Sequence, residues 1–186
     1  MTTPETILDF VQETRDLTTE EAFLAEHPYP FLLQEDTGQS LPSRDDRRTT
    51  RLRGSAIVPK GEGFLQGDVT IYRIYPRQEP DQASDEPPAV TIGRDEGCDL
   101  IVEDGSISAV HAAFGIAYDD DGERCFTVAD CGSSNGTFLN GERLTARVPT
   151  ILADNDSVRL GPAVKFQFFT APQFFQFLSL YRRMKK

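Results

Sequence analysis

The sequence predicts an all-β domain, a sandwich of two antiparallel sheets, with a helical extension at its N-terminus and a short C-terminal helix. Short strand-like segments follow one another from Gly67 onward, and turn residues separate them each time, which is typical of a sandwich or barrel. Helical signals lie near the two ends of the chain. We therefore divide the chain into an N-terminal extension (1–66), a sandwich domain (67–170) and a C-terminal helix (171–186).

The N-terminal extension is expected to hold two short helices, a polar linker and room for extra strands. Thr3 and Pro4 suit the N-cap and the first position of one helix. Thr18 and Glu21 have the spacing of a capping box, and Pro28 ends the second helix. We assign no function to these helices from the sequence.

The strand candidates are short, and β-branched and aromatic residues are frequent in them. They lie at 31–34, 69–75, 89–92, 100–102, 112–118, 125–129, 137–139, 157–160 and 164–169. The final helix begins at Pro172 and places Phe174, Phe177, Leu178 and Tyr181 on one face, so we expect it to pack back on the sandwich.

Composition excludes several classes of function. The net charge of −11 argues against nucleic acid and against an anionic membrane as partner. No apolar run approaches the roughly 20 residues of a membrane span, and the first ten residues lack a basic signal region, so we expect a cytoplasmic protein. Cys98, Cys125 and Cys131 are odd in number and form no CxxC pair, so we expect reduced thiols, no metal and no cofactor.

Four loop signatures lie between the predicted strands. They are Gly93-Arg94, Ser106–His111, Gly132–Thr137 and Asn140-Gly141. The last is the strongest short-range signal for a tight hairpin. Each of the others, taken alone, is also typical of an ordinary surface turn.

In their order and spacing these loops resemble the forkhead-associated (FHA) domain family. The resemblance rests on Gly93-Arg94, Asp99–Ile101, Ser108–His111, Asp130–Gly141 and Leu152–Gly161, and covers roughly residues 67–170. It implies a sandwich of two antiparallel sheets with recognition loops gathered at one end. It also implies that the domain binds phosphothreonine peptides.

The resemblance implies a role for each loop residue. Arg94 would hold the phosphate, Ser108 would donate its hydroxyl to a phosphate oxygen, Ser134 would lie at the phosphate or the peptide, and Asn135 would bond the peptide main chain. Five residues would shape the loops: Gly93, His111, Ser133, Gly136 and Asn140.

The chemistry of these residue types agrees with those roles. A phosphothreonine carries about −1.5 to −2 charges and strong acceptor oxygens. A guanidinium matches it with charge-assisted bonds, and serine hydroxyls add short neutral donors that an acidic chain does not repel. Ala109 departs from the family pattern, because a basic or amide residue usually stands there. Asn155 stands where the family pattern has a glycine. Asparagine is tolerated in the left-handed backbone conformation that such a turn requires.

The leading hypothesis is therefore a phosphothreonine-binding module in Ser/Thr kinase signalling, whose partner is a phosphorylated protein, either a kinase or its substrate. The alternative is an FHA-fold scaffold for an unphosphorylated partner, which Ala109 motivates. An enzyme is disfavoured, because no acid is placed to orient His111 beside Ser108. Thr49 and Thr50 follow a basic run, which suggests either a kinase target that fills the site in cis or simply a basic linker.

Overall fold

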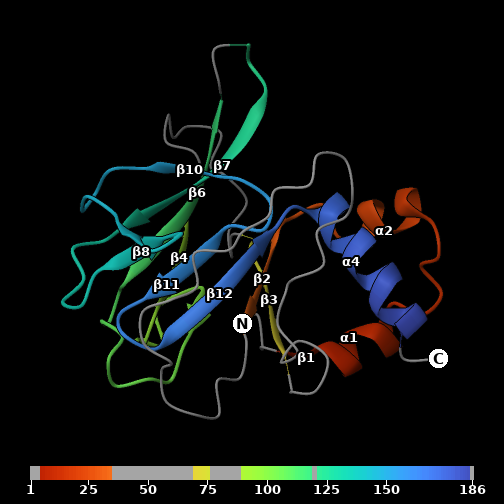
Figure 1. Ribbon diagram of the computed structural model, residues 1–186, viewed down its shortest axis with the longest axis horizontal. Coiled ribbons are helices and arrows are strands. Elements are labelled where there is room, and N and C mark those ends of the chain that lie inside the picture. The colour runs from red at the N-terminus through yellow and green to blue at the C-terminus, as the bar shows by residue number, and fades with distance from the viewer. Residues whose placement is uncertain (1–4, 35–68, 76–88, 119–120, 185–186) are drawn as a thin grey trace.

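The computed structural model describes residues 5–34, 69–75, 89–118 and 121–184. Two β-sheets face each other, and three helices cover part of the outer face of the larger sheet (Figure 1). The predicted polar linker, including Thr49 and Thr50, lies outside the described residues.

The larger sheet has seven strands. In spatial order they are β1 (Glu5–Thr6), β3 (Thr70–Arg73), β2 (Phe31–Gln34), β12 (Val164–Phe169), β11 (Ser157–Leu160), β8 (Thr137–Leu139) and β9 (Glu142–Arg143). Strand β2 comes from the N-terminal part of the chain, yet it pairs with both β3 and β12 inside the sheet. The N-terminal segment and the sandwich therefore share one sheet.

The smaller sheet has five strands. In order they are β10 (Thr150–Leu152), β7 (Arg124–Asp130), β6 (Ala112–Tyr118), β4 (Val90–Gly93) and β5 (Leu100–Ile101). The predicted fold class is confirmed, with one correction: β4 and β5 pair in parallel. Residues 94–99 connect them, so the chain turns back within this short segment before it pairs.

Apolar side chains on the two faces of the larger sheet form two separate apolar clusters. Leu32 and Phe168 face the smaller sheet and join the core of the sandwich, whereas their neighbours Phe31, Leu33 and Phe169 face the helices. Successive side chains of a strand point to opposite faces, so a strand buried on both sides is apolar throughout. This explains the unbroken apolar runs of β2 and of the end of β12.

The helices are α1 (Ile7–Glu13), α2 (Glu20–Glu26) and α4 (Ala171–Met184). The predicted start of the first helix at Pro4 is wrong: residues 5–6 pair with β3, and Thr6 caps the helix by accepting a hydrogen bond from Asp9 N. Sheet pairing keeps the backbone extended up to Thr6. The second cap is Thr19, which bonds Ala22 N, and not Thr18.

Aromatic rings hold the helical layer on the sheet. Phe174 of α4 stacks on Phe31 with ring centroids 4.1 Å apart, and Phe10 and Phe23 surround the pair. All four side chains are fully buried. The described helices lie over β1, β2, β3 and β12, and away from β8, β9 and β11 (Figure 1).

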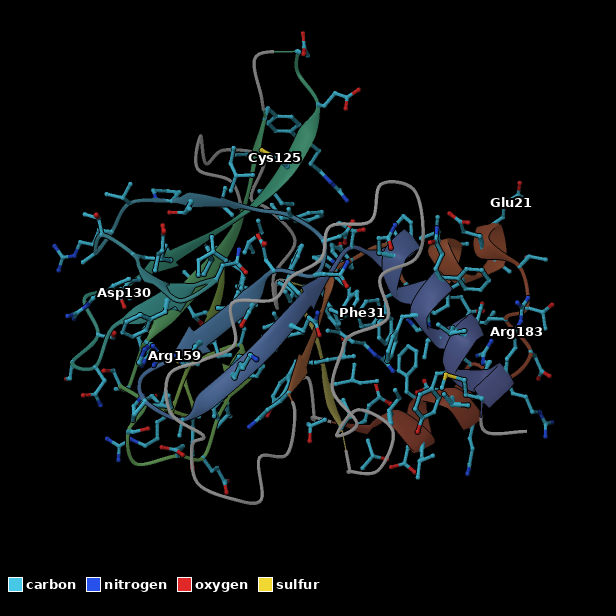
Figure 2. All side chains as sticks on the ribbon, in the orientation of Figure 1. Glu21, Phe31, Cys125, Asp130, Arg159 and Arg183 are labelled. Atoms are coloured by element: carbon cyan, nitrogen blue, oxygen red, sulfur yellow. The ribbon has the colours of Figure 1, made fainter. Side chains whose placement is uncertain are left out.

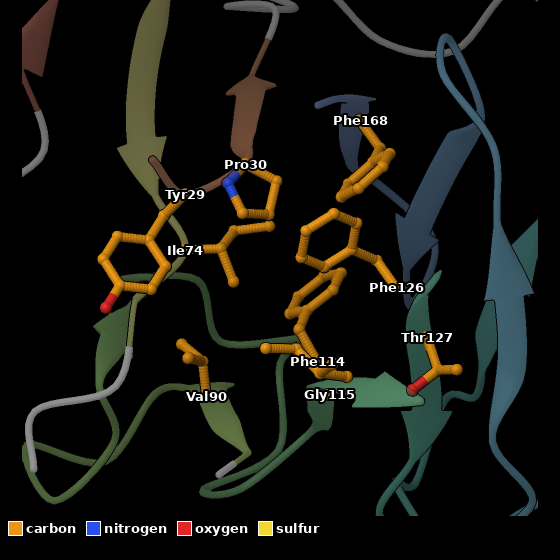
Figure 3. A pocket seen from close by; sticks show the side chains of 10 residues that line it. Tyr29, Pro30, Ile74, Val90, Phe114, Gly115, Phe126, Thr127 and Phe168 are labelled. Atoms are coloured by element: carbon orange, nitrogen blue, oxygen red, sulfur yellow. The ribbon is translucent and has the colours of Figure 1, made fainter. Parts of the chain in front are cut away.

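A small apolar cavity lies between the sheets at the end of the sandwich opposite Gly93. Its volume is about 20 Å³, and its lining includes Ile74, Val90, Phe114 and Phe126 (Figure 3). A space of that size admits about one water molecule and no larger ligand. The predicted loops lie at the other end of the sandwich.

Candidate functional site

The turn after β4 is bonded directly to the loop before β6. The backbone N–H groups of Arg94 and Asp95 donate to the carbonyl oxygens of Ser108 and Ala109, each at 3.0 Å. Gly93 makes this approach possible, since a Cβ there would lie only 2.1 Å from the Ala109 oxygen. The requirement for glycine at position 93 is therefore steric.

His111 joins the same loop to the segment that follows β7. Its side chain is fully buried; Nδ1 accepts a hydrogen bond from Ser108 N at 3.1 Å, and Nε2 lies 3.2 Å from the carbonyl oxygen of Gly136. These partners assign a neutral ring that carries its proton on Nε2. Burial lowers the pKa of His111, which favours the same neutral form.

Asp130 organises the Gly132–Thr137 loop. Its carboxylate accepts hydrogen bonds from Gly132 N at 2.8 Å, Ser133 N at 3.0 Å, Ser133 Oγ at 2.6 Å and Thr137 Oγ1 at 2.7 Å. Burial alone would raise the pKa of Asp130, but these donors lower it overall. The carboxylate therefore stays charged and holds the loop. Ser133 Oγ also accepts from Gly136 N, and Gly136 has a φ of 81°.

Ser108, Ser134 and Asn135 meet at the surface between these two loops. Ser134 N donates to Ser108 Oγ at 3.1 Å, and Asn135 Nδ2 donates to the carbonyl oxygen of Ser106 at 2.8 Å. The Ser108 oxygen is thus an acceptor within the protein, which leaves its O–H to be donated outward. Asn135 is fixed through its amide nitrogen, so its Oδ1 remains as an acceptor for a ligand N–H.

Arg94 stands at the edge of this group. Its backbone is bonded to Ser108, its side chain is exposed, and it takes part in no ion pair among the residues the structure describes. The site thus combines one exposed cation with hydroxyl and amide groups that the loops hold in place.

Asn140 lies at the other end of β8 from Gly136. Asn140 and Gly141 have φ angles of 52° and 89° and connect β8 to β9, which confirms the predicted hairpin. Asn140 Nδ2 donates to Asp156 Oδ1, and Asn140 Oδ1 accepts from Ser157 N. This residue fastens the hairpin to β11 and is remote from Ser108. Asn155 adopts a φ of 67°, as a left-handed turn requires.

The contacts of His111 exclude base catalysis on Ser108. Both ring nitrogens are engaged with backbone groups, and neither bonds Ser108 Oγ. Within the described residues, no group of three or more His, Cys, Asp or Glu side chains is placed to hold a metal ion. No helix in the described ranges is long and apolar enough to cross a membrane.

Sequence reasoning included three residues in the loop signatures or matched segments but gave them no role, although they complete the site. The role of Asp130 could have been found, because an aspartate two residues before glycine is the signature of an Asx turn. Ser106 and Gly161 carry no such signal: Gly161 lies against Ser106 and Asn135 only through the fold.

Known proteins match the central part of the chain. The model of the FHA domain family matches residues 90–161. The DNA damage response protein kinase DUN1 of Saccharomyces cerevisiae is 37% identical over 81 residues, which are 42% of this chain and 15% of DUN1. The glycogen accumulation regulator GarA of Mycolicibacterium smegmatis is 35% identical over 86 residues, which are 46% of this chain and 49% of GarA.

Solved structures match a similar share. The MEK1 FHA domain in complex with a HOP1 phosphothreonine peptide is 30% identical, with a TM-score of 0.42, and the match covers 54% of this chain and 87% of that chain. The chain spans less than half the length of the curated relatives described above. Through residues 90–161, with their Gly93-Arg94, Ser108–His111 and Ser133–Thr137 loops, the chain belongs to the FHA domain family.

Proposed function

We propose that this protein is a phosphothreonine-binding module in Ser/Thr kinase signalling. The observation that carries the proposal is the bond from Ser134 N to Ser108 Oγ, which places two serines and Asn135 around one surface point. The similarity to the protein kinase DUN1 supports a setting in kinase pathways. The partner is then a phosphorylated protein, a kinase or a kinase substrate.

The arrangement suits a phosphate for two reasons. The Ser108 hydroxyl is a neutral donor, which the net charge of −11 does not repel from an anion. Arg94 supplies the positive charge, and a guanidinium binds phosphate oxygens through charge-assisted bonds. The loops are already fixed by His111 and Asp130, so binding costs little ordering entropy.

Ala109 makes Arg94 the main cation of the proposed phosphate site. The Ala109 side chain is exposed and offers no donor, and its carbonyl oxygen is occupied by Asp95 N and the Cys98 thiol. We therefore expect the affinity for phosphothreonine to depend almost wholly on Arg94 and the serines.

Ala109 also supports a second candidate function, a scaffold of FHA fold that binds an unphosphorylated partner. In that case the loops would serve as a protein-binding surface, and the phosphate would add nothing to affinity. For either function we propose a cytoplasmic location, since an odd number of cysteines with no CxxC pair suits a reducing compartment. The acidic net charge disfavours nucleic acid and anionic membranes as partners.

The test is fluorescence anisotropy with a degenerate phosphothreonine peptide library and its unphosphorylated counterpart. Wild type, Arg94→Ala and the control Arg183→Ala, which removes an exposed arginine of α4, are compared. We expect binding that needs the phosphate and falls at least about 10-fold in Arg94→Ala alone, as for a lost charged hydrogen bond. Equal binding of both libraries would establish the scaffold instead.

A further inference from the structure

The part of the larger sheet that the described helices leave uncovered carries a transverse row of cations. In register across four strands lie Arg143 of β9, Phe138 of β8, Arg159 of β11 and Lys165 of β12. Residues directly opposite each other on paired strands point to the same face. Val158 and Leu160 are in the sandwich core, so Arg159 and its row partners face outward.

The three cations of this row are not neutralised within the described part of the chain. The ion pairs there join Arg15 to Asp16, and Arg73 to Glu5 and Glu13. Arg143 and Lys165 are exposed. In a chain with a net charge of −11, three aligned cations with no ion-pair partner among the described residues create a local positive potential, which attracts an anionic ligand.

Two of these cations reach the recognition loops. The Arg143 side chain lies against Gly136, where a Cβ would meet its Nε at 2.6 Å. The Arg159 guanidinium lies over the Phe138 ring, 3.8 Å from its centroid, and donates to the carbonyl oxygen of Gly161. Figure 2 shows Arg159 on the half of the sheet that the described helices do not cover, away from the helical layer that carries Arg183.

Gly161 connects this row to the proposed peptide site. A Cβ at Gly161 would lie 3.4 Å from the Asn135 Cβ and 3.2 Å from the Ser106 oxygen. Arg143 borders Gly136, which directly follows Asn135. A peptide whose main chain bonds Asn135 therefore has both guanidinium groups beside it, at the rim between the loops and the outer face of the sheet.

We infer that Arg143, Arg159 and Lys165 form a subsite for acidic side chains that flank the phosphothreonine of the partner. This inference rests on the proposed function and names the class of sequence that the module selects. Stacking on Phe138 and the bond to Gly161 hold Arg159 in place, so little entropy is lost when a carboxylate binds. Three cations match a few carboxylates, whereas the many phosphates of a nucleic acid would extend beyond the row and be repelled more strongly by the acidic chain.

The experiment uses the full chain and three phosphothreonine peptides of equal length, with acidic residues before the phosphothreonine, after it, or on neither side. Wild type is compared with R143Q/R159Q/K165Q and with R15Q/R124Q/R183Q, which removes three exposed arginines elsewhere. We expect wild type to prefer one acidic peptide about 5- to 10-fold, the sum of three exposed pairs. The row variant should lose this preference, and the control should keep it.

The outcomes separate this inference from the proposed function. Phosphate-dependent binding with equal affinity for all three peptides would overturn the inference alone, as would a preference that the row variant keeps. Binding that ignores the phosphate would overturn both. The variant R143Q/K165Q changes only exposed side chains. It should lose part of the preference for the acidic peptide with no loss of stability, which shows that misfolding is not the cause of the lost preference. Tighter binding to duplex DNA than to the acidic peptide would make the row a nucleic-acid surface instead.

Discussion

The Ser108 backbone N–H donates to His111 Nδ1 at 3.1 Å, while His111 Nε2 bonds the Gly136 oxygen on the other loop. One buried neutral imidazole thus sets the distance between the two loops that carry Ser108, Ser134 and Asn135. The ring can do this only as long as Nδ1 is unprotonated, because a protonated Nδ1 would face the Ser108 donor.

The first prediction concerns pH. Burial holds the pKa of His111 below its ordinary 6.5 in the folded protein, so the unfolded chain binds protons more readily. The stabilisation from His111 is therefore complete above about pH 6.5 and is lost as pH falls toward the lowered folded pKa. Denaturant unfolding of wild type and His111→Gln, from about pH 7.5 to pH 5, measures this.

The difference between the two proteins isolates His111. His27 also has a lowered pKa, mainly through burial and through Arg73, and it contributes equally to both curves. We expect the stability of wild type to fall more steeply with acid than that of His111→Gln. Parallel curves would show that His111 does not titrate with folding.

The second prediction tests the close approach at Gly93. In Gly93→Ala the new methyl would clash with the Ala109 oxygen, at 2.1 Å, and would force the two loops apart. We expect a loss of about 2–3 kcal/mol in unfolding free energy, as for an overpacked site, together with weaker peptide binding. Gly105→Ala is the control, since nothing lies within 4 Å of its added Cβ, and should change stability by less than about 0.5 kcal/mol.

The third prediction concerns a substitution that adds a hydrogen-bond donor at the site. Ala109 is exposed and lies beside Ser108, so Ala109→Arg adds a cation near the proposed phosphate without disturbing the core. We expect about 10-fold tighter binding of phosphothreonine peptides and no change for unphosphorylated ones, the effect of one charge-assisted bond. Isothermal titration calorimetry measures both. An equal gain for the two peptides would indicate general charge attraction instead of phosphate contact.

The fourth prediction concerns the helical layer. Phe174 is fully buried and contacts Phe10, Phe31 and Phe169, so Phe174→Ala removes a ring from the centre of the second apolar cluster. We expect a loss of about 3–5 kcal/mol by chemical denaturation. Phe175→Ala, at a partly buried position, should cost clearly less. Similar losses for the two variants would contradict the packing described.

Most strand locations and the tight hairpin could be predicted from the sequence. The strands at 31–34, 112–118, 137–139, 157–160 and 164–169 agree with β2, β6, β8, β11 and β12. These segments combine β-propensity with apolar patterning, and the Asn140-Gly141 turn needs the positive φ that these residues tolerate. Such preferences depend on neighbouring residues along the chain, so they can be recognised in the sequence without knowledge of the fold.

Strand β1 was not predicted, β9 was predicted only as the second arm of the hairpin, and β10 was not predicted. They have two or three residues each and exist through pairing with β3, β8 and β7. Ile151 of β10 is even exposed, so no alternation marks that strand. Residues 5–6 pair with β3, so their backbone is extended. The first helix is therefore capped by Thr6, and not by Thr3 as predicted.

The sequence by itself determined the loop residues, their order and the family they belong to. Only the tertiary structure decided how His111 and Asp130 fasten the loops, and that Arg143, Arg159 and Lys165 form one row. The physical reason is that turn and strand preferences depend on adjacent residues. Hydrogen bonds between loops and the register across strands depend instead on which distant segments the sandwich brings together.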